Sequence, residues 1–244
     1  MSIKPFSEIA EYYDLLFEDV DYERWAKYVV RFFSVARVKV ERVLEVGCGT
    51  GNLTKHLKDM GFRVVGLDSS EEMVRVARRK LPEVEFFVAD VRDFSLNEEF
   101  DAVVSTFDSL NNILDDEGLV RAFLNVRRHL RDGGVFVFDL NTPHAMQTIW
   151  NEAVFVKVLR NGIYSIWRGE YLGNAKSKLN LTLFVPYGEN LYRKIEEIYI
   201  ERGYSPSQVK VFLTKAGFTG VYSFDDLTTE KPTSKSTRVT YVAV

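Results

Sequence analysis

Four predicted strands of this 244-residue chain end in residues that could bind a polar ligand. The first runs into a glycine turn at Gly47, and the next three are followed by Asp68, Asp90 and Asp108. In an open parallel sheet the carboxyl ends of the strands lie along one edge, where ligands bind beside the switch in strand order. Asp68 stands where a carboxylate can accept both hydroxyls of a ribose, and Asp90 where one can accept from an exocyclic amine such as that of adenine. The spacing therefore predicts a nucleoside-binding edge.

The spacing of the glycine turn distinguishes between two candidate ligands, a nicotinamide dinucleotide and S-adenosylmethionine. Gly47, Gly49 and Gly51 alternate, and glycine tolerates positive φ and leaves no Cβ, so backbone can press against a ligand. A dinucleotide turn has the spacing G-x-G-x-x-G and cradles a pyrophosphate, whereas Asn52 takes the place of its third glycine here. Glu45 would repel a pyrophosphate but could accept from an α-amino group. The pattern therefore favours S-adenosylmethionine.

Alternating strands and helices position these residues. Apolar runs predict strands over 42–46, 63–67, 84–88, 101–105, 135–139, 219–225 and 237–244. Helical spacing predicts helices over 51–60, after a cap at Ser69 or Ser70, over 116–131, and after Ser205. This alternation predicts an α/β fold, a doubly wound, Rossmann-like and mostly parallel sheet with helices on both faces.

Two segments depart from this alternation. Residues 6–37 have helical spacing, precede the glycine turn and could fold over the ligand as a lid. Residues 148–203 contain β-prone runs separated by turns rich in glycine and asparagine, which predicts an antiparallel meander of three or four strands. We therefore divide the chain into a core, 1–147 with 204–244, and an insertion, 148–203.

The bulk composition excludes several classes of protein. A net charge of −3 argues against a chain built mainly to hold nucleic acid. Cys48 is the only cysteine, so there is no intrachain disulfide, and within the turn we interpret it as a packing residue. Residues 1–5 contain no apolar signal region and no run approaches the roughly 18 apolar residues of a membrane span, so we expect a cytoplasmic protein without a membrane partner. No cluster has metal-ligand spacing, and we expect no metal site.

These motifs resemble those of the class I S-adenosylmethionine-dependent methyltransferases over nearly the whole chain. Residues 43–51 look like the first motif of the family, 65–70 the second, 88–92 the third and 100–104 the fourth. The resemblance implies a sheet of seven strands in which the last strand runs antiparallel beside the fifth.

The resemblance also implies a set of cofactor contacts. The residues that it assigns to S-adenosylmethionine are Tyr13, Glu45, Gly47, Cys48, Gly49, Asp68, Ser69, Met73, Asp90, Val91 and Phe107. Among them, Gly47 and Gly49 lie alongside the methionine part of the cofactor, and Asp68 binds the ribose. Met73 and Val91 pack on the adenine, whose amine contacts Asp90.

Within that family, Tyr12-Tyr13-Asp14 and residues 107–112 resemble the corresponding segments of the enzymes that methylate small molecules. This branch includes sugar and amine N-methyltransferases. In that branch a helix with a similar Tyr-Tyr-Asp closes over the cofactor, and an antiparallel insertion covers the substrate or forms a dimer. Residues 148–203 occupy the place of the insertion. We therefore expect a small-molecule acceptor, with a homodimer as an open alternative for the role of the insertion.

Methyl transfer to nitrogen or oxygen is an in-line displacement that needs mainly alignment and removal of water. An amine must be neutral to react, so a carboxylate, a histidine or a tyrosine can take its proton. The candidates for this role are Asp108, His144, Tyr13 and Glu201. His56 and His129 read as surface residues.

Two alternatives stay open, an RNA or protein methyltransferase and a subunit that binds the cofactor without catalysis. Adenine-N6 enzymes carry an Asn/Asp-Pro-Pro-aromatic motif after the fourth strand, where this chain has Phe107-Asp108-Ser109-Leu110. Cytosine-C5 enzymes carry Pro-Cys there, but the only cysteine is Cys48. The sequence therefore does not favour nucleic acid as the acceptor.

Overall fold

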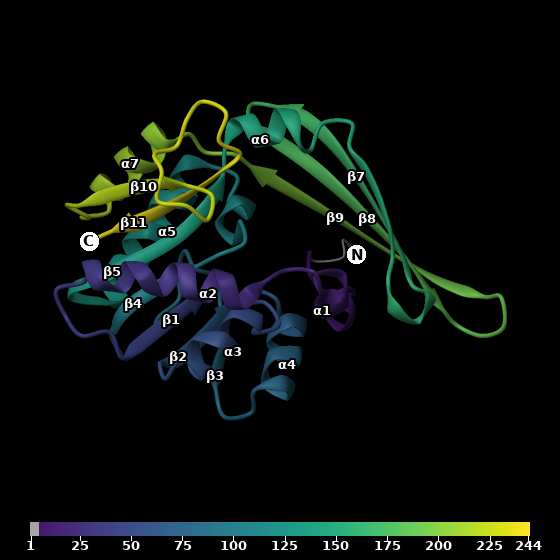
Figure 1. The fold of residues 1–244 in the computed structure, drawn as a ribbon, viewed down its shortest axis with the longest axis horizontal. Helices are drawn as coiled ribbons and strands as arrows, with labels where there is room; N and C mark the ends of the chain where they lie inside the picture. Colours follow the sequence, from purple (N-terminus) through teal and green to yellow (C-terminus); the bar gives the residue numbers. More distant parts are fainter. Residues whose placement is uncertain (1–4) are drawn as a thin grey trace.

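Two β-sheets dominate the computed structural model, which describes residues 5–244 (Figure 1). The larger sheet has seven strands in the order β10-β11-β5-β4-β1-β2-β3. Its strands are β1 Arg42–Val46, β2 Arg63–Asp68, β3 Glu85–Val88, β4 Phe100–Ser105, β5 Leu130–Asn141, β10 Val221–Asp225 and β11 Arg238–Ala243. β1 runs parallel to both β2 and β4, and β11 runs antiparallel to β5. The predicted sheet and its antiparallel last strand are confirmed.

Helices cover both faces of this sheet, because alternate apolar side chains of the central strands point to opposite sides. One face packs against α2 Tyr22–Arg31 and α3 Asn52–Asp59, with α4 Glu71–Lys80 beside β3. The other face packs against α5 Asp116–His129 and α7 Pro206–Lys215. The chain leaves β1 for β2 and β3, then returns to β4 on the other side of β1. The switch in strand order therefore lies between β1 and β4, beside the glycine turn.

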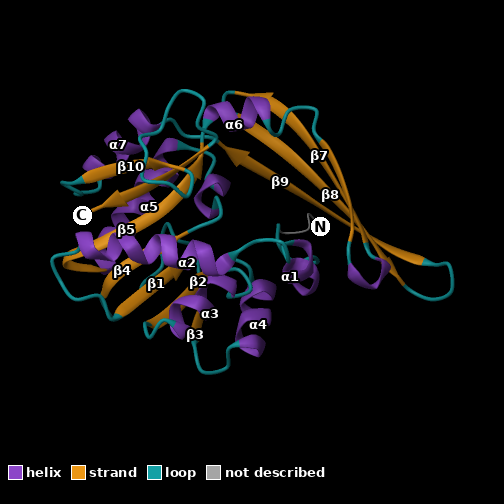
Figure 2. Cartoon of the chain, in the orientation of Figure 1, coloured by secondary structure: helices purple, strands orange, loops and turns teal. Residues whose placement is uncertain are grey.

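The second sheet is antiparallel and has the order β6-β7-β8-β9. Its strands are β6 Val154–Val158, β7 Tyr164–Gly173, β8 Lys176–Pro186 and β9 Tyr192–Arg202, and α6 Pro143–Thr148 leads into it. The predicted meander is confirmed with four strands. Figure 2 shows these long strands extending away from the body of the molecule like an arm.

The prediction of one continuous helical region over 6–37 is wrong. The structure has short pieces, η1 Ala10–Tyr12, α1 Tyr13–Leu16, α2 and η2 Phe32–Val35. The break before α2 arises because the Asp21 side chain accepts the Arg24 N–H and starts a new helix there. The first pieces pack against the second sheet in one apolar cluster that includes Ile9, Leu16 and Leu181.

His129 is not the surface residue that its neighbours suggested. Its side chain is buried, its ring stacks on Phe94 with centroids 4.2 Å apart, and its Nε2 accepts the Leu96 N–H at 3.1 Å. The neighbouring Arg127 and Arg128 suggested an exposed face of the helix. The burial of His129 was not evident from the sequence, because it depends on how α5 turns this residue toward the sheet. His56 is half-buried on α3.

Residues 1–4, which belong to the stretch searched for a signal region, lie outside the described residues. Within residues 5–244, no helix combines the length and the apolar character needed to cross a bilayer.

Candidate active site

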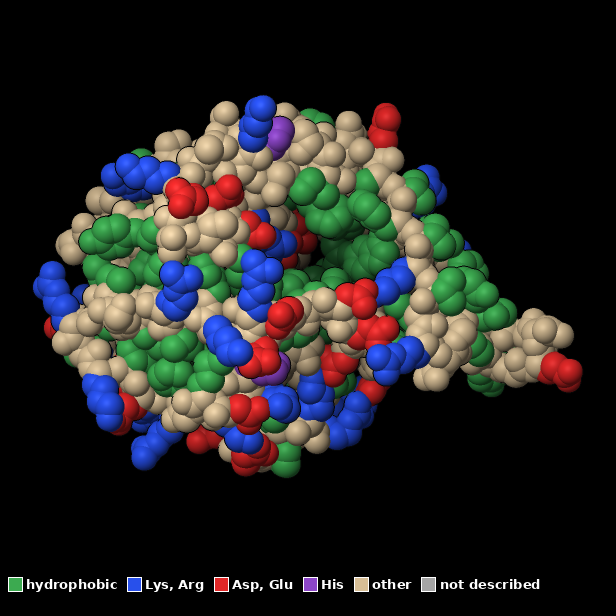
Figure 3. Space-filling model, in the orientation of Figure 1, with side chains coloured by type: hydrophobic (Ala, Val, Ile, Leu, Met, Phe, Trp, Pro, Cys, Tyr) green, Lys and Arg blue, Asp and Glu red, His purple; other side chains and the backbone are tan. Residues whose placement is uncertain are grey.

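A cavity of about 1110 Å³ lies between the carboxyl ends of the parallel strands and the second sheet. It extends from Asp68, the last residue of β2, and Asp90, after β3, to Asp108 after β4 and Glu201 on β9. Figure 3 shows the opening as a hollow with apolar walls between the body and the arm. The strand-end carboxylates that the sequence singled out therefore meet in one space.

The glycine turn forms one wall of this cavity. Gly49 has a φ of +54°, and a Cβ placed on it would meet no atom within 4 Å, so its backbone faces open space. Gly47 has a φ of +70°, and a Cβ on it would lie 2.5 Å from Cβ of Ser109. Gly49 thus leaves room for a ligand against the backbone, whereas Gly47 lets the loop after β4 pack closely on the turn.

Asp68 is fixed by backbone donors at the end of β2. Its Oδ2 accepts the Gly49 N–H at 2.8 Å and its Oδ1 accepts the Ser70 N–H at 2.9 Å. Burial raises the pKa of this carboxyl, and the backbone N–H groups oppose that rise. A carboxylate has about four lone-pair sites, so these backbone donors leave it able to accept from a ribose hydroxyl. Ser69 and Met73 line the cavity beside it, as predicted residues of the cofactor site.

Asp90 lines the cavity after β3 and is paired with Arg92. The guanidinium Nη2 lies 2.5 Å from Oδ2, and this pairing lowers the pKa of Asp90. An adenine amine would therefore share the carboxylate with Arg92. Val91 also lines the cavity, where it could pack on an adenine ring.

Two predicted cofactor residues, Glu45 and Cys48, are not part of the cavity lining. Glu45 is buried, accepts the hydroxyl of Thr54 on α3, and has its pKa raised to about 8 by burial. The Cys48 side chain packs in an apolar cluster with Val74 and Ala77 of α4, and burial raises its thiol pKa. These side chains point behind the turn, so the packing interpretation of Cys48 agrees with the structure and Glu45 would act on a ligand only from a distance.

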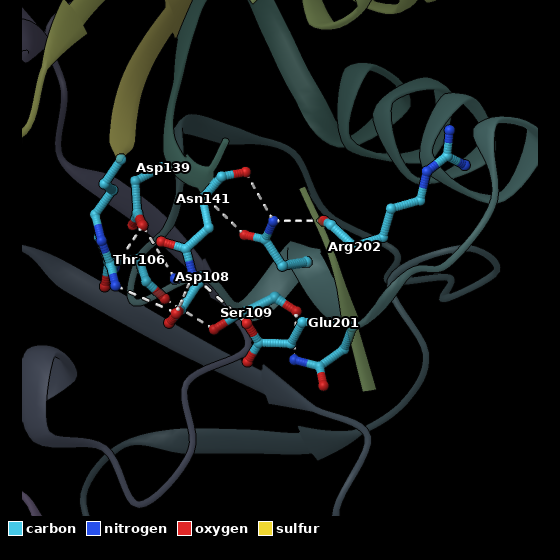
Figure 4. A network of polar contacts seen from close by, with 10 residues as sticks. Thr106, Asp108, Ser109, Asp139, Asn141, Glu201 and Arg202 are labelled. Atoms are coloured by element: carbon cyan, nitrogen blue, oxygen red, sulfur yellow. Dashed lines mark hydrogen bonds and ion pairs between the residues drawn. The ribbon is translucent and has the colours of Figure 1, made fainter. Parts of the chain in front are cut away.

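Three carboxylates, those of Asp108, Asp139 and Glu201, lie close together at the other end of the cavity (Figure 4). Arg238 on β11 donates from Nη1 to Oδ2 of Asp139 at 2.8 Å and from Nη2 to Oδ2 of Asp108 at 3.2 Å. Asn141 donates from Nδ2 to the same oxygen of Asp108 at 2.6 Å, and its Nδ2 lies 3.5 Å from Oε2 of Glu201. Four elements that are distant in sequence thus bring these groups together.

The electrostatics of this cluster follow from burial. Burial raises the pKa of Glu201 to about 8, and the charge of Asp108 adds to the rise while Arg238 opposes it. Burial likewise raises the pKa of Asp139 to about 6 against the pull of Arg238. One guanidinium cannot neutralise three carboxylates, so their mutual repulsion adds to the effect of burial on Glu201 and Asp139.

The sequence identified Asp108 and Glu201 but missed Asp139 and Arg238. Asp139 ends the predicted strand 135–139, so the rule that selected the other strand-end carboxylates could have found it. Arg238 gave no signal, because nothing in one sequence distinguishes it from other arginines.

The turn after β4 holds Phe107 and Asp108 in an unusual backbone conformation. Their φ values are 60° and 51°, in the left-handed region that costs on the order of 1–3 kcal/mol for each residue without a glycine. The Asp108 N–H donates to Oδ2 of Asp139 at 3.0 Å, and the Phe107 ring packs 5.1 Å from the ring of Trp25. Both residues line the cavity as a result.

The N-terminal segment closes the cavity over the glycine turn. Asp14 accepts from Thr50 Oγ1 at 2.5 Å, Asn52 Nδ2 at 2.9 Å and Lys80 Nζ at 2.6 Å. The adjacent Tyr13 lines the cavity, and burial raises the pKa of its hydroxyl well above the usual value. Asn52, which replaces a dinucleotide glycine, therefore serves to dock the residues that cover the site.

A second attachment ties this segment to β9. The buried carboxylate of Glu197 accepts the N–H groups of Phe6, Ser7, Glu8 and Ile9 at distances from 2.6 to 3.1 Å. The hydroxyl of Tyr199 donates to the same carboxylate at 2.6 Å. The sequence analysis missed Glu197, because only the fold brings residues 190 positions apart into contact.

His144 lies apart from this cluster. It is half-buried on the short helix α6 and is not among the residues that line the cavity. Asp108, Tyr13 and Glu201 do line it. Within residues 5–244, no group of three or more His, Cys, Asp and Glu side chains could hold a metal ion.

A sheet of this topology, with a glycine turn beside the switch in strand order and acidic strand ends, defines a Rossmann-like methyltransferase fold. The family described as "Methyltransferase domain" matches residues 43–134. A protein of Geobacillus sp. (strain WCH70) with a provisional methyltransferase name is 32% identical over 98% of both chains. The chain belongs to the S-adenosylmethionine-dependent methyltransferases, and S-adenosylmethionine is its methyl donor.

Two further proteins show the range of the similarity. The crystal structure of an S-adenosylmethionine-dependent methyltransferase from Clostridium acetobutylicum ATCC 824 is 25% identical, covers 97% of each chain and superposes with a TM-score of 0.85. The dTDP-3-amino-3,6-dideoxy-alpha-D-glucopyranose N,N-dimethyltransferase of Streptomyces fradiae is 35% identical over 54% of this chain and 52% of its own.

Proposed function

We propose that this enzyme transfers the methyl group of S-adenosylmethionine to an amine nitrogen of a small-molecule acceptor. One observation carries the proposal, namely that the carboxylates of the buried Glu201 and the half-buried Asp108 line the cavity beyond the cofactor residues. An amine reaches an enzyme as a cation, and a site with excess negative charge attracts it. The relative from Streptomyces fradiae, whose name describes methylation of an amino sugar, supports the same class of acceptor.

The residues at the strand ends fit the cofactor. Gly49 leaves open space against its backbone, and Asp68 keeps lone pairs for the ribose hydroxyls. Met73, Val91 and Asp90 line the space beyond, where an adenine would pack. When bound there, S-adenosylmethionine supplies a methyl group already activated by its sulfonium.

The carboxylates prepare the acceptor. An ammonium group has no lone pair, so the proton must leave before nitrogen can attack. Glu201, with its pKa raised to about 8, is the group in this cluster best matched to take that proton near neutral pH. Asp108, held by Asn141 and Arg238, is placed to orient the nitrogen. Tyr13 faces the same space from the covering segment.

The covering segment and the second sheet enclose the reaction. Asp14 and Glu197 fasten the segment from two sides, and exclusion of water strengthens electrostatic interactions inside a site. Within the predicted lid, 6–37, we assign the part before α2 to this role, since α2 packs on the large sheet. We assign 148–203 as the acceptor-covering part of the enzyme.

The outer face of the second sheet supports self-association. Val154, Val156 and Val158 alternate along β6 on one face and are 61%, 65% and 63% exposed. Ile166 and Tyr164 extend this apolar stripe on β7, opposite Val156 and Val158. Exposed apolar stripes of this kind mark interaction sites. We assign this face to a homodimer of a cytoplasmic enzyme.

Transfer of a labelled methyl group tests the proposed function. The enzyme is incubated with methyl-labelled S-adenosylmethionine and, in separate reactions, a panel of small amines, matched alcohols, bulk RNA and a protein mixture. Label is expected in the amines, and Glu201→Gln should reduce kcat with little change in cofactor binding. Label in RNA or protein, with none in any amine, would show that the acceptor assignment is wrong.

A further inference from the structure

The walls of the acceptor half of the cavity indicate what kind of molecule carries the amine. Beyond the cofactor residues, the lining is mainly aromatic. These aromatic residues come from the lid, from the second sheet and from the segment between α6 and β6. They are Phe17, Trp150, Phe155, Trp167 and Tyr199. Trp167 links them, with its ring centroid 6.1 Å from that of Phe17 and 6.2 Å from that of Tyr199. Such a wall binds flat, apolar surface.

The cations at the cavity are already engaged. Arg238 bridges Asp139 and Asp108, and Arg92 is paired with Asp90. Lys157 donates to Asp19 at 2.5 Å at the outer edge of the second sheet. A phosphate needs donors such as arginine or lysine, so it would have to compete with these carboxylates.

The carboxylates outnumber the cations along the same lining. At the acceptor end Asp108 and Glu201 line the cavity, and Arg238 beside them is shared with Asp139. Asp68, Glu71, Glu72 and Asp90 add negative charge along the cofactor half. This excess attracts a cation and repels an anion. A nucleoside diphosphate on the acceptor would add at least two negative charges to a space that is already acidic.

We propose that the acceptor is an amine carried on an apolar, aromatic-sized body without a phosphate group. The amine lies at the Asp108–Glu201 end and the body against the wall around Trp167. This inference rests on the proposed amine methylation and narrows the class of amine that serves as acceptor. It separates this enzyme from relatives that act on nucleotide-linked amino sugars.

A matched pair of acceptors tests the inference directly. Tyramine and tyramine O-phosphate differ only in the phosphate, and mass spectrometry shows which atom carries the label. The kcat/KM for tyramine is expected to exceed that for its phosphate by about tenfold or more, and thymidine diphosphate at millimolar concentration should not inhibit. A preference for the phosphate ester, competitive inhibition by thymidine diphosphate, or no turnover of any phosphate-free amine in the panel would overturn the inference.

Variants of the aromatic wall provide a second readout. Trp167→Ala should raise the KM for tyramine about tenfold without changing the Kd for S-adenosylmethionine, and Trp167→Phe should restore most of the loss. Thr182→Ala is the matched control, because Thr182 pairs with Ile166 on the opposite face of the same sheet. An equal KM in Trp167→Ala and wild type would contradict the proposed place of the apolar body.

The two proposals fail in different ways. If label enters only alcohols, RNA or protein, the proposed amine methylation fails. If label enters amines but the phosphate-bearing ones are preferred, only the inference about the acceptor body fails.

Discussion

Arg238 and Asp139 form a buried ion pair on neighbouring strands of the large sheet, with Nη1 2.8 Å from Oδ2. The Asp139 side chain is almost fully buried, and the same guanidinium also reaches Asp108. The ion pair therefore holds the turn after β4 in place while it limits the repulsion among the carboxylates around it.

Replacement of Arg238 by Met should destabilise the protein by about 3–5 kcal/mol, because it leaves buried carboxylates without their cation. Urea unfolding measures the loss. Arg238→Lys keeps one charge but cannot bridge two carboxylates, so it should lose less. Equal stability of wild type and Arg238→Met would mean that the carboxylates already carry protons and do not need the guanidinium.

Asp68→Ala should weaken binding of S-adenosylmethionine by about 1–3 kcal/mol, the penalty for hydrogen-bonding groups left without a partner. It also removes the acceptor of the Gly49 and Ser70 N–H groups, so Asp68→Asn, which keeps one acceptor oxygen, should lose less. Titration calorimetry measures both variants. An unchanged Kd for Asp68→Ala would contradict the ribose assignment.

The pKa of Glu201 determines two pH dependences. For amine acceptors, kcat/KM should rise with pH through about 8, since only the carboxylate form can take a proton. Stability should change in the opposite direction. The folded protein binds this proton more tightly than the unfolded chain, so the free energy of unfolding should fall as pH rises from 4.5 to about 8.

Glu201→Gln should remove the rise in kcat/KM and flatten part of the fall in stability. Glu45, with its pKa also raised to about 8, and Asp139, with its pKa raised to about 6, would account for the part that persists. Glu196→Gln is the control, because Glu196 lies on the same strand with its pKa lowered by Lys194. An unchanged pH–rate profile in Glu201→Gln would assign the proton to another group.

Asp14→Ala should release the lid from the glycine turn, because Thr50, Asn52 and Lys80 lose their shared acceptor. We expect dissociation of S-adenosylmethionine to be about tenfold faster, equivalent to about 1.4 kcal/mol. Glu197→Gln should act in the same direction by loosening the segment from β9. Stopped-flow release measures the rates, with Glu23→Gln as the surface control, because Glu23 pairs with Lys27 on the same helix. Wild-type rates in both lid variants would show that neither contact retains the cofactor.

Val156→Asp should shift a dimer toward monomer, because it places a charge in the exposed apolar stripe of β6. Light scattering coupled to size-exclusion chromatography measures the mass of both proteins. A monomeric wild type at high micromolar concentration would contradict the proposed homodimer. Retained methyl transfer in a monomeric variant would show that one chain contains a complete site.

Most of the core could be predicted from local patterns. The strand from Arg42 to Val46 has an apolar, β-prone run followed by glycines, and both features act within a few residues. The same holds for the N-cap at Ser205 and for the turns of the second sheet. The helical region over 6–37 was predicted less well, because the cap at Asp21 and the contacts of Glu197 interrupt a pattern that looks continuous.

The sequence by itself determined the donor side of this enzyme, since Gly49, Asp68 and Asp90 owe their place to strand ends that local spacing reveals. Only the tertiary structure decided the acceptor side. Asp108, Asp139, Glu201 and Arg238 come from four strands or their ends, and their mutual distances and burial set their pKa values. Local periodicity carries no information about which distant strands meet, so the charge and shape of the acceptor pocket appear only in the fold.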